Sequence, residues 1–166
     1  MTRKNMPEFD SSDFFRLLRA ANGYAELGMW SDAWDQLEEI APEQRYCFEV
    51  GKLRVRILLA LKRWDAVAIL AESLITLGAA DADVFLAAAE AVCRVRSIAD
   101  AKAILLRAEP RIQDNAEISF RLACYECQSG ELERAKTRLK RAIEMDSKFR
   151  SRAIEDEDLK PLWDAL

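Results

Sequence analysis

Apolar residues recur along most of the chain at intervals of three and four, the spacing of helices with one buried face. Glycines stand where several of these stretches end, at Gly28, Gly78 and Gly130. Asp81 and Asp114 stand where stretches begin and are expected to cap them. The pattern predicts eight helices, near residues 12–28, 30–41, 43–62, 64–77, 81–95, 98–109, 115–129 and 131–146.

Four of the expected helices begin in a similar way, with a tight turn followed by an alanine on the buried side. The segments are GMWSDAWDQL, KRWDAVAIL, RSIADAKAIL and GELERAKTRL, and the aligned alanines are Ala33, Ala66, Ala101 and Ala135. These alanines are 33, 35 and 34 residues apart. A leucine follows each of them by four residues, which continues the same helical face, at Leu37, Leu70, Leu105 and Leu139. The period predicts that helix pairs repeat along the chain.

In this register the chain resembles the tetratricopeptide-repeat family over roughly residues 13–147. The first repeat carries most of the signature residues: Leu17, Ala20, Ala21, Tyr24, Gly28, Trp30, Ala33 and Pro42. The resemblance implies an all-α fold, a right-handed α-solenoid of about four helix-turn-helix repeats, at about 14–46, 47–81, 82–115 and 116–147. Residues 1–12 are expected to form an N-terminal extension, and residues 148–166 a short C-terminal cap over the last repeat.

The resemblance also implies which residues could meet a partner, because the first helix of each repeat lines the concave side in that family. The expected inward-facing residues are Phe15, Leu18, Asn22, Phe48, Val55, Leu58, Leu86, Glu90, Phe120 and Cys124. Most are apolar, so we hypothesise that an apolar peptide or amphipathic helix of another protein lies there, anchored by Phe48, Leu86 and Phe120. Alternatively, the groove is covered from within the solenoid, by residues 1–12, or by a second copy of the chain in a homodimer.

Composition narrows the expected partner and location. The 166-residue chain carries a net charge of −4, which gives no general attraction for nucleic acid or anionic lipid. No segment approaches the roughly 20 apolar residues needed to span a bilayer, and residues 1–10 do not resemble a signal peptide. We therefore expect a cytoplasmic protein that binds a protein or peptide, and neither nucleic acid nor a membrane.

The residues offer little support for catalysis. The sequence contains no histidine, so no general base titrating near neutral pH and no Ser-His-Asp or Cys-His site is expected. Phosphate-binding glycine loops are also missing, and we expect no enzyme activity, no cofactor and no metal. The leading hypothesis is a non-enzymatic interaction module, an adaptor or assembly scaffold. A small cytoplasmic chaperone for a hydrophobic or secreted client is the alternative.

Two further features have a functional and a structural interpretation. Cys124 and Cys127 form a C-x-x-C that, with Cys93, could sense metal or oxidant, although its place inside an expected helix favours simple packing. Residues 134–152 carry eight basic side chains against two acidic ones. This excess could meet an acidic partner or RNA, or it could be the hydrated face of a helix neutralised by residues 155–158.

Overall fold

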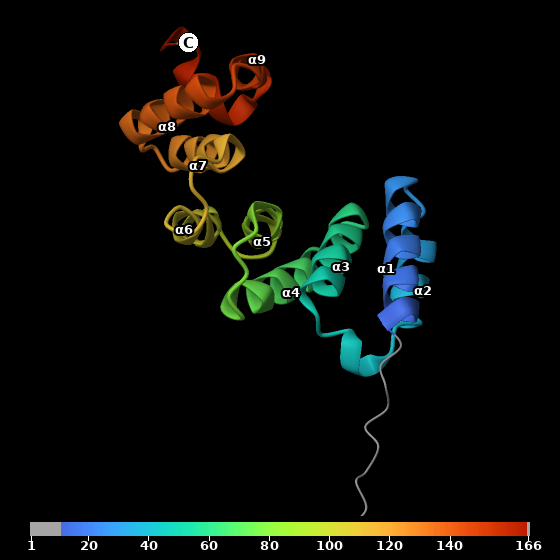
Figure 1. Cartoon of the computed structure of the whole chain (residues 1–166). Coiled ribbons are helices and arrows are strands. Elements are labelled where there is room, and N and C mark those ends of the chain that lie inside the picture. The colour runs from blue at the N-terminus through green and yellow to red at the C-terminus, as the bar shows by residue number, and fades with distance from the viewer. Residues whose placement is uncertain (1–10, 166) are drawn as a thin grey trace, which may run out of the picture. The chain divides into compact units, whose positions relative to one another are not determined.

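The computed structural model describes residues 11–165, and this part of the chain folds into helices with no strand (Figure 1). All eight expected helices are present: α1 (Ser11–Glu26), α2 (Trp30–Glu38), α3 (Phe48–Ala60), α4 (Trp64–Thr76), α5 (Ala82–Val95), α6 (Ile98–Ala108), α7 (Ala116–Gln128) and α8 (Leu132–Met145). The prediction of an all-α helical-repeat fold is therefore confirmed.

Three shorter elements complete the described chain: η1 (Pro42–Gln44), α9 (Lys148–Glu155) and η2 (Glu157–Ala165). The third helix was expected from residue 43, but a 3₁₀ turn with Pro42 at its start intervenes. Arg45 then turns back, and its Nε donates to the carbonyl oxygen of Ile40 at 2.6 Å. This bond satisfies a carbonyl just beyond α2, and α3 begins only at Phe48.

The chain divides into two compact units, the first ending at Leu61 and the second beginning at Lys62. The division falls between α3 and α4, inside the expected second repeat. The expected repeat boundaries remain a prediction, and each unit is described by itself below.

In the first unit, α1, α2 and α3 enclose one apolar core. Small residues lie where the helices meet, and larger ones fill the space between them. The core residues are Leu17, Ala21, Ala25, Ala33, Leu37, Ile40, Val50, Leu53 and Ile57. The helices are therefore held together mainly by the stripes that their apolar spacing predicted.

In the second unit, α4 packs on α5, α5 on α6, α6 on α7 and α7 on α8. The segment formed by α9 and η2 then packs against α7 and α8. It closes a C-terminal core that contains Phe120, Cys124, Leu139, Phe149, Ala153, Leu159 and Leu162. Residues 148–165 thus cover the apolar side of the last helix pair, as the expected cap would.

The structure corrects the alignment of the second repeat by one residue. Ala33, Ala101 and Ala135 each occupy the fourth position of their helix and are fully buried. In α4 the fourth position is Val67, also fully buried, whereas Ala66 is half-buried. With Val67 in place of Ala66, all three spacings become 34 residues. The repeat is thus more regular than the alanines alone indicated.

The turns explain how this period is kept. Gly28, Gly78 and Gly130 have φ values of 74°, 102° and 78°, a left-handed conformation that glycine adopts without strain, as expected at helix ends. Lys62 takes the same conformation, with φ of 55°, one period of 34 residues after Gly28. A lysine therefore replaces the turn glycine in the second repeat.

The expected helix caps were half right. Asp81 caps α5, and its carboxylate accepts hydrogen bonds from the backbone N–H groups of Asp83 and Val84. Asp114 does not cap α7, because it lies in the left-handed region with φ of 51°. Its neighbour Asn115 is the cap, and its side-chain oxygen accepts from the N–H of Ile118 at 2.9 Å.

Candidate partner-binding surface

On α1 of the first unit, the expected inward positions are accessible. Phe15 is 59% exposed, and its ring packs edge-on against Phe14 with centroids 5.2 Å apart. Leu18 and Asn22 are half-buried, and the Asn22 amide nitrogen donates to the Leu18 carbonyl oxygen at 3.1 Å. These three residues can meet a partner, and their role remains a prediction.

On α3 the corrected alignment changes the residues that take the inward positions. Phe48 is 36% exposed and Leu58 is half-buried, but Val55 is 3% exposed and belongs to the interior. Moving each position by one residue replaces Val55 with Arg56, which is exposed, and brings in the half-buried Lys52. The same shift replaces Phe48 with the exposed Glu49, so this face of α3 is charged where the sequence predicted it to be apolar.

A signal for the correct alignment was present in the sequence. Trp30 and Trp64 lie 34 residues apart, and each is the first residue of its helix. Aligning these tryptophans would have placed Lys52 and Arg56 at inward positions. The alanine was misleading because the fourth position of α4 is occupied by valine, which packs there equally well.

On α5 of the second unit, the expected surface is accessible and mixed in character. Leu86 and Glu90 are half-buried, and Arg94 continues the same helical stripe with its guanidinium 4.7 Å from the ring centroid of Trp64. Tyr125 of α7 lies nearby: burial raises the pKa of its phenol, and the negative charge of Glu90 raises it further. Leu86, Glu90 and Arg94 thus present an apolar side chain, an acid and a base on successive turns of α5.

The structure differs from the prediction at Phe120 and Cys124. Phe120 is 1% exposed, and its ring centroid lies 5.2 Å from that of Phe149 in α9. Arg152 covers both rings, at 4.7 and 4.8 Å from their centroids, and forms an ion pair with Glu117. Phe120 and Cys124 are therefore inaccessible to a partner, because α9 and η2 of the same chain cover them.

The two cysteines of the C-x-x-C pair, Cys124 and Cys127, are buried, which disfavours their reaction as thiolates. Burial raises the pKa of the Cys124 thiol, and Asp156, whose carboxylate accepts a hydrogen bond from its sulfur at 3.7 Å, raises it further. Burial also raises the pKa of Cys127. Since the thiolate is the reactive form, both changes lower the reactivity of the pair. Among residues 11–165, no cluster of three Cys, Asp or Glu side chains could hold a metal ion.

Thiol labelling should therefore separate two pairs of cysteines. In the folded protein, Ellman's reagent should react readily with the half-buried Cys47 and Cys93, and with Cys124 and Cys127 only after unfolding in urea. Cys93→Ser should remove one of the two fast thiols. Rapid labelling of the C-x-x-C pair in the folded state would contradict its burial.

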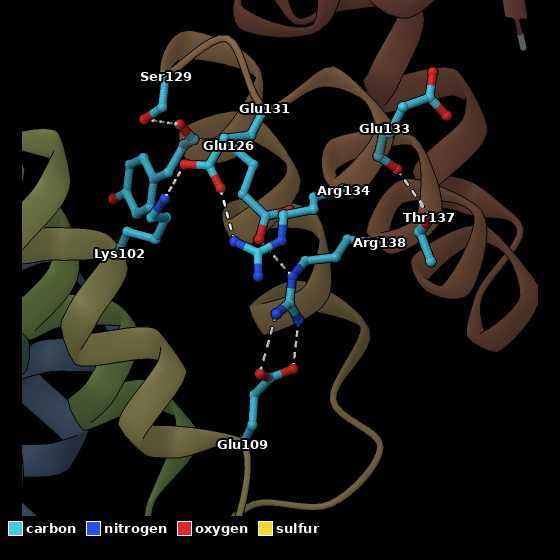
Figure 2. A network of polar contacts seen from close by, with 10 residues as sticks. Lys102, Glu109, Glu126, Ser129, Glu131, Glu133, Arg134, Thr137 and Arg138 are labelled. Atoms are coloured by element: carbon cyan, nitrogen blue, oxygen red, sulfur yellow. Dashed lines mark hydrogen bonds and ion pairs between the residues drawn. The ribbon is translucent and has the colours of Figure 1, made fainter.

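Most of the basic side chains in residues 134–152 are used inside the protein. Arg138 bridges Glu126 of α7 and Glu109 at the end of α6, as Figure 2 shows. The other pairs with acids outside the segment are Arg134 with Glu131, Arg141 with Asp114 and Arg152 with Glu117. These acids, rather than residues 155–158, are the main partners. Lys136 makes no ion pair with any residue that the structure describes.

A second bridge joins the same two repeats. Lys102 of α6 forms an ion pair with Glu131, which immediately precedes α8 (Figure 2). Lys102 and Arg134 together lower the pKa of the Glu131 carboxyl. The polar network therefore links α6 to the helix pair α7 and α8 and leaves less free positive charge than the sequence indicated.

The helix pairs, their 34-residue period and their left-handed turns are those of a tetratricopeptide-like fold. No family model matches the chain, and no curated protein matches it in sequence. None of the helices in the described part is long and apolar enough to cross a membrane.

Solved structures of tetratricopeptide proteins share this fold. TTC0263, a thermophilic TPR protein of Thermus thermophilus, is 19% identical, with a TM-score of 0.69 over 90% of this chain and 81% of that one. YrrB, described as a TPR protein with an unusual peptide-binding site, is 16% identical, with a TM-score of 0.71 over 90% and 78%. MamA from Desulfovibrio magneticus RS-1 is 14% identical, with a TM-score of 0.69 over 80% and 75%.

Proposed function

We propose that this protein is a non-enzymatic interaction module, an adaptor or assembly scaffold of the cytoplasm, that holds a segment of a partner protein. The observation that carries the proposal is the accessible stripe of α5, defined by Leu86, Glu90 and Arg94. These residues follow one another by four positions and so lie along one side of the helix. YrrB, which shares the fold, is described as having a peptide-binding site, and this supports the same kind of role.

The chemistry of this stripe favours an amphipathic helix as the partner segment. Leu86 offers an apolar contact, while Glu90 and Arg94 offer opposite charges on the next two turns. Arg121 of α7 adds a half-buried cation that also pairs with Glu117 at 3.3 Å. Glu90 and Arg94 pair only loosely with each other, at 3.9 Å, and a purely apolar peptide would remove the water around them without adding a hydrogen bond, which costs free energy. The proposed segment therefore carries apolar and charged residues on the same face.

Substituting Leu86 tests this role. Leu86→Glu should reduce recovery of the bound partner by about tenfold or more in affinity capture from native cell extract, because it places a carboxylate beside Glu90 and removes the apolar contact. Quantitative mass spectrometry of the captured proteins measures the loss. Circular dichroism checks that the helices persist.

Leu77→Glu is the matched control. Leu77 is 82% exposed in the turn after α4, so the same substitution should leave both the fold and the captured proteins unchanged. Equal recovery with Leu86→Glu and with the unsubstituted protein would refute the stripe as the binding surface. Failure of the unsubstituted protein to retain any specific partner would refute the proposed function itself.

A further inference from the structure

The cations of α8 lie on two different sides of the helix. Arg134, Arg138 and Arg141 turn toward the preceding repeat and pair with acids there or at the turn before α8. Lys136 and Lys140, which are one turn apart, are exposed, and Lys140 pairs with Glu144 of the same helix at 3.8 Å. Among the residues that the structure describes, Lys136 on this second side therefore has no carboxylate partner.

This second side borders a pocket of about 350 Å³, which we call the end pocket. Its floor is apolar and is formed by Leu139 and Ile143 of α8 and Leu162 of η2. In the described part of the chain, its rim carries the cations Lys136, Lys140 and Arg150 and the carboxylate of Glu144, which pairs with Lys140. An apolar floor surrounded by cations fits an apolar side chain that is flanked by acidic residues.

The repeat shows what packs at the equivalent place one period earlier. On α6, Lys102 and Glu109 contact the following repeat, where they pair with Glu131 and Arg138. The residues 34 positions later are Lys136 and Ile143, both of which line the end pocket. A helix stacked here in the manner of α8 would place an acid against Lys136. Glu109 of α6 lies against Arg138, which is seven residues after Glu131. At the equivalent place the stacked helix would meet Ile143, and an apolar side chain would fit there.

We propose that the end pocket docks a helix from an acidic partner protein, which extends the stack of repeats. The helix places a carboxylate near its N-terminus on Lys136 and an apolar side chain on Ile143 and Leu162. Symmetric pairing of two copies through this surface is disfavoured, because it would bring two sets of Lys136, Lys140 and Arg150 together. This surface is separate from the α5 stripe and can fail or succeed independently of it.

A synthetic helix provides the probe. We would use a fluorescein-labelled, acetylated and amidated 15-residue peptide with glutamate first, leucine at positions 5, 8 and 12, and alanine and glutamate elsewhere. A second peptide carries lysine in place of every glutamate. Added to the 166-residue chain, the acidic peptide should shift the backbone amide resonances of residues 136–144, 150 and 162. The lysine peptide should leave them unchanged.

Reversing the rim charges tests the electrostatic part. Lys136→Glu with Lys140→Glu should weaken binding of the acidic peptide by at least about tenfold in fluorescence anisotropy, and added salt should weaken binding to the unsubstituted protein. Arg63→Glu with Arg107→Glu changes the charge equally at exposed positions outside the pocket and should leave binding unchanged.

Three results would overturn the proposal. The first is no shift at the pocket amides with peptide up to ~1 mM. The second is equal binding of the acidic and lysine peptides, or equal weakening by the two double variants. The third is a dimer in sedimentation experiments that Lys136→Glu with Lys140→Glu abolishes, because a second copy would then be the occupant. Loss of partner capture by Leu86→Glu bears only on the α5 stripe.

Discussion

Replacing Arg138 with leucine is expected to lower the free energy of unfolding by about 3–5 kcal/mol. The Arg138 Nε donates to Glu126 at 2.9 Å, and the guanidinium also pairs with Glu109. Glu126 is only 2% exposed, and its second carboxylate oxygen has no hydrogen-bond partner among the described residues. Removing Arg138 would leave this buried carboxylate without a counter-charge. Urea unfolding of the full chain, followed by circular dichroism, measures the loss.

Two control variants separate this effect from a general loss of surface charge. Arg134→Leu removes a cation one turn earlier whose side chain is 74% exposed, and it should change stability by less than about 1 kcal/mol. Adding Glu126→Leu to Arg138→Leu should recover most of the lost stability, because no buried charge is then left unpaired. Equal effects of Arg134→Leu and Arg138→Leu would contradict a buried bridge between the repeats.

Phe120→Ala is expected to lower the free energy of unfolding by about 3–5 kcal/mol, because it removes a fully buried ring that Phe149 and Arg152 cover. Leu86→Ala, at a half-buried position on the α5 stripe, should cost substantially less. Urea unfolding of both variants in parallel gives the comparison. The two residues were expected to be equivalent anchors, and the structure instead gives them different roles.

Partner capture supplies the complementary measurement for Phe120. If Phe120→Ala left stability within about 0.5 kcal/mol of the unsubstituted protein yet abolished capture, the ring would be a binding anchor. That result would require α9 to leave the surface of α7 when a partner binds. The covered arrangement instead predicts that Phe120→Ala and Phe149→Ala lower stability together, since each ring packs on the other.

The helices themselves could be predicted from local patterns. Each helix pair carries apolar stripes at the helical spacing. In the first and last pairs, the turn glycines Gly28 and Gly130 end the first helix. The errors arose where two neighbouring residues were equally plausible. Ala66 and Val67 can both pack in a helix interface, and Asp114 and Asn115 can both cap a helix. Local preference does not separate such pairs, whereas the position of the whole helix in the core does.

The candidate site was harder to predict, because accessibility depends on segments distant in sequence. Position within a repeat indicates that Leu86 and Phe120 share one side of the first helices, yet only Leu86 remains accessible. Phe120 is buried because Phe149 and Arg152, some thirty residues later, pack on it. Likewise, most partners of the basic segment lie more than ten residues earlier in the chain, in α7, at the end of α6 and in the turn between them, so its charge could not be judged from neighbours in the chain.

The amino-acid order alone specifies helices, their approximate ends and a repeat of about 34 residues, because these follow from side-chain spacing and turn conformations within one helix pair. Packing between distant segments decides which apolar surfaces stay open. Residues 148–165 cover the apolar side of α7 and α8, while the end pocket beside α8 keeps its apolar floor and its cations. Burial is a property of all the elements that meet at a surface, so no single helix can reveal it.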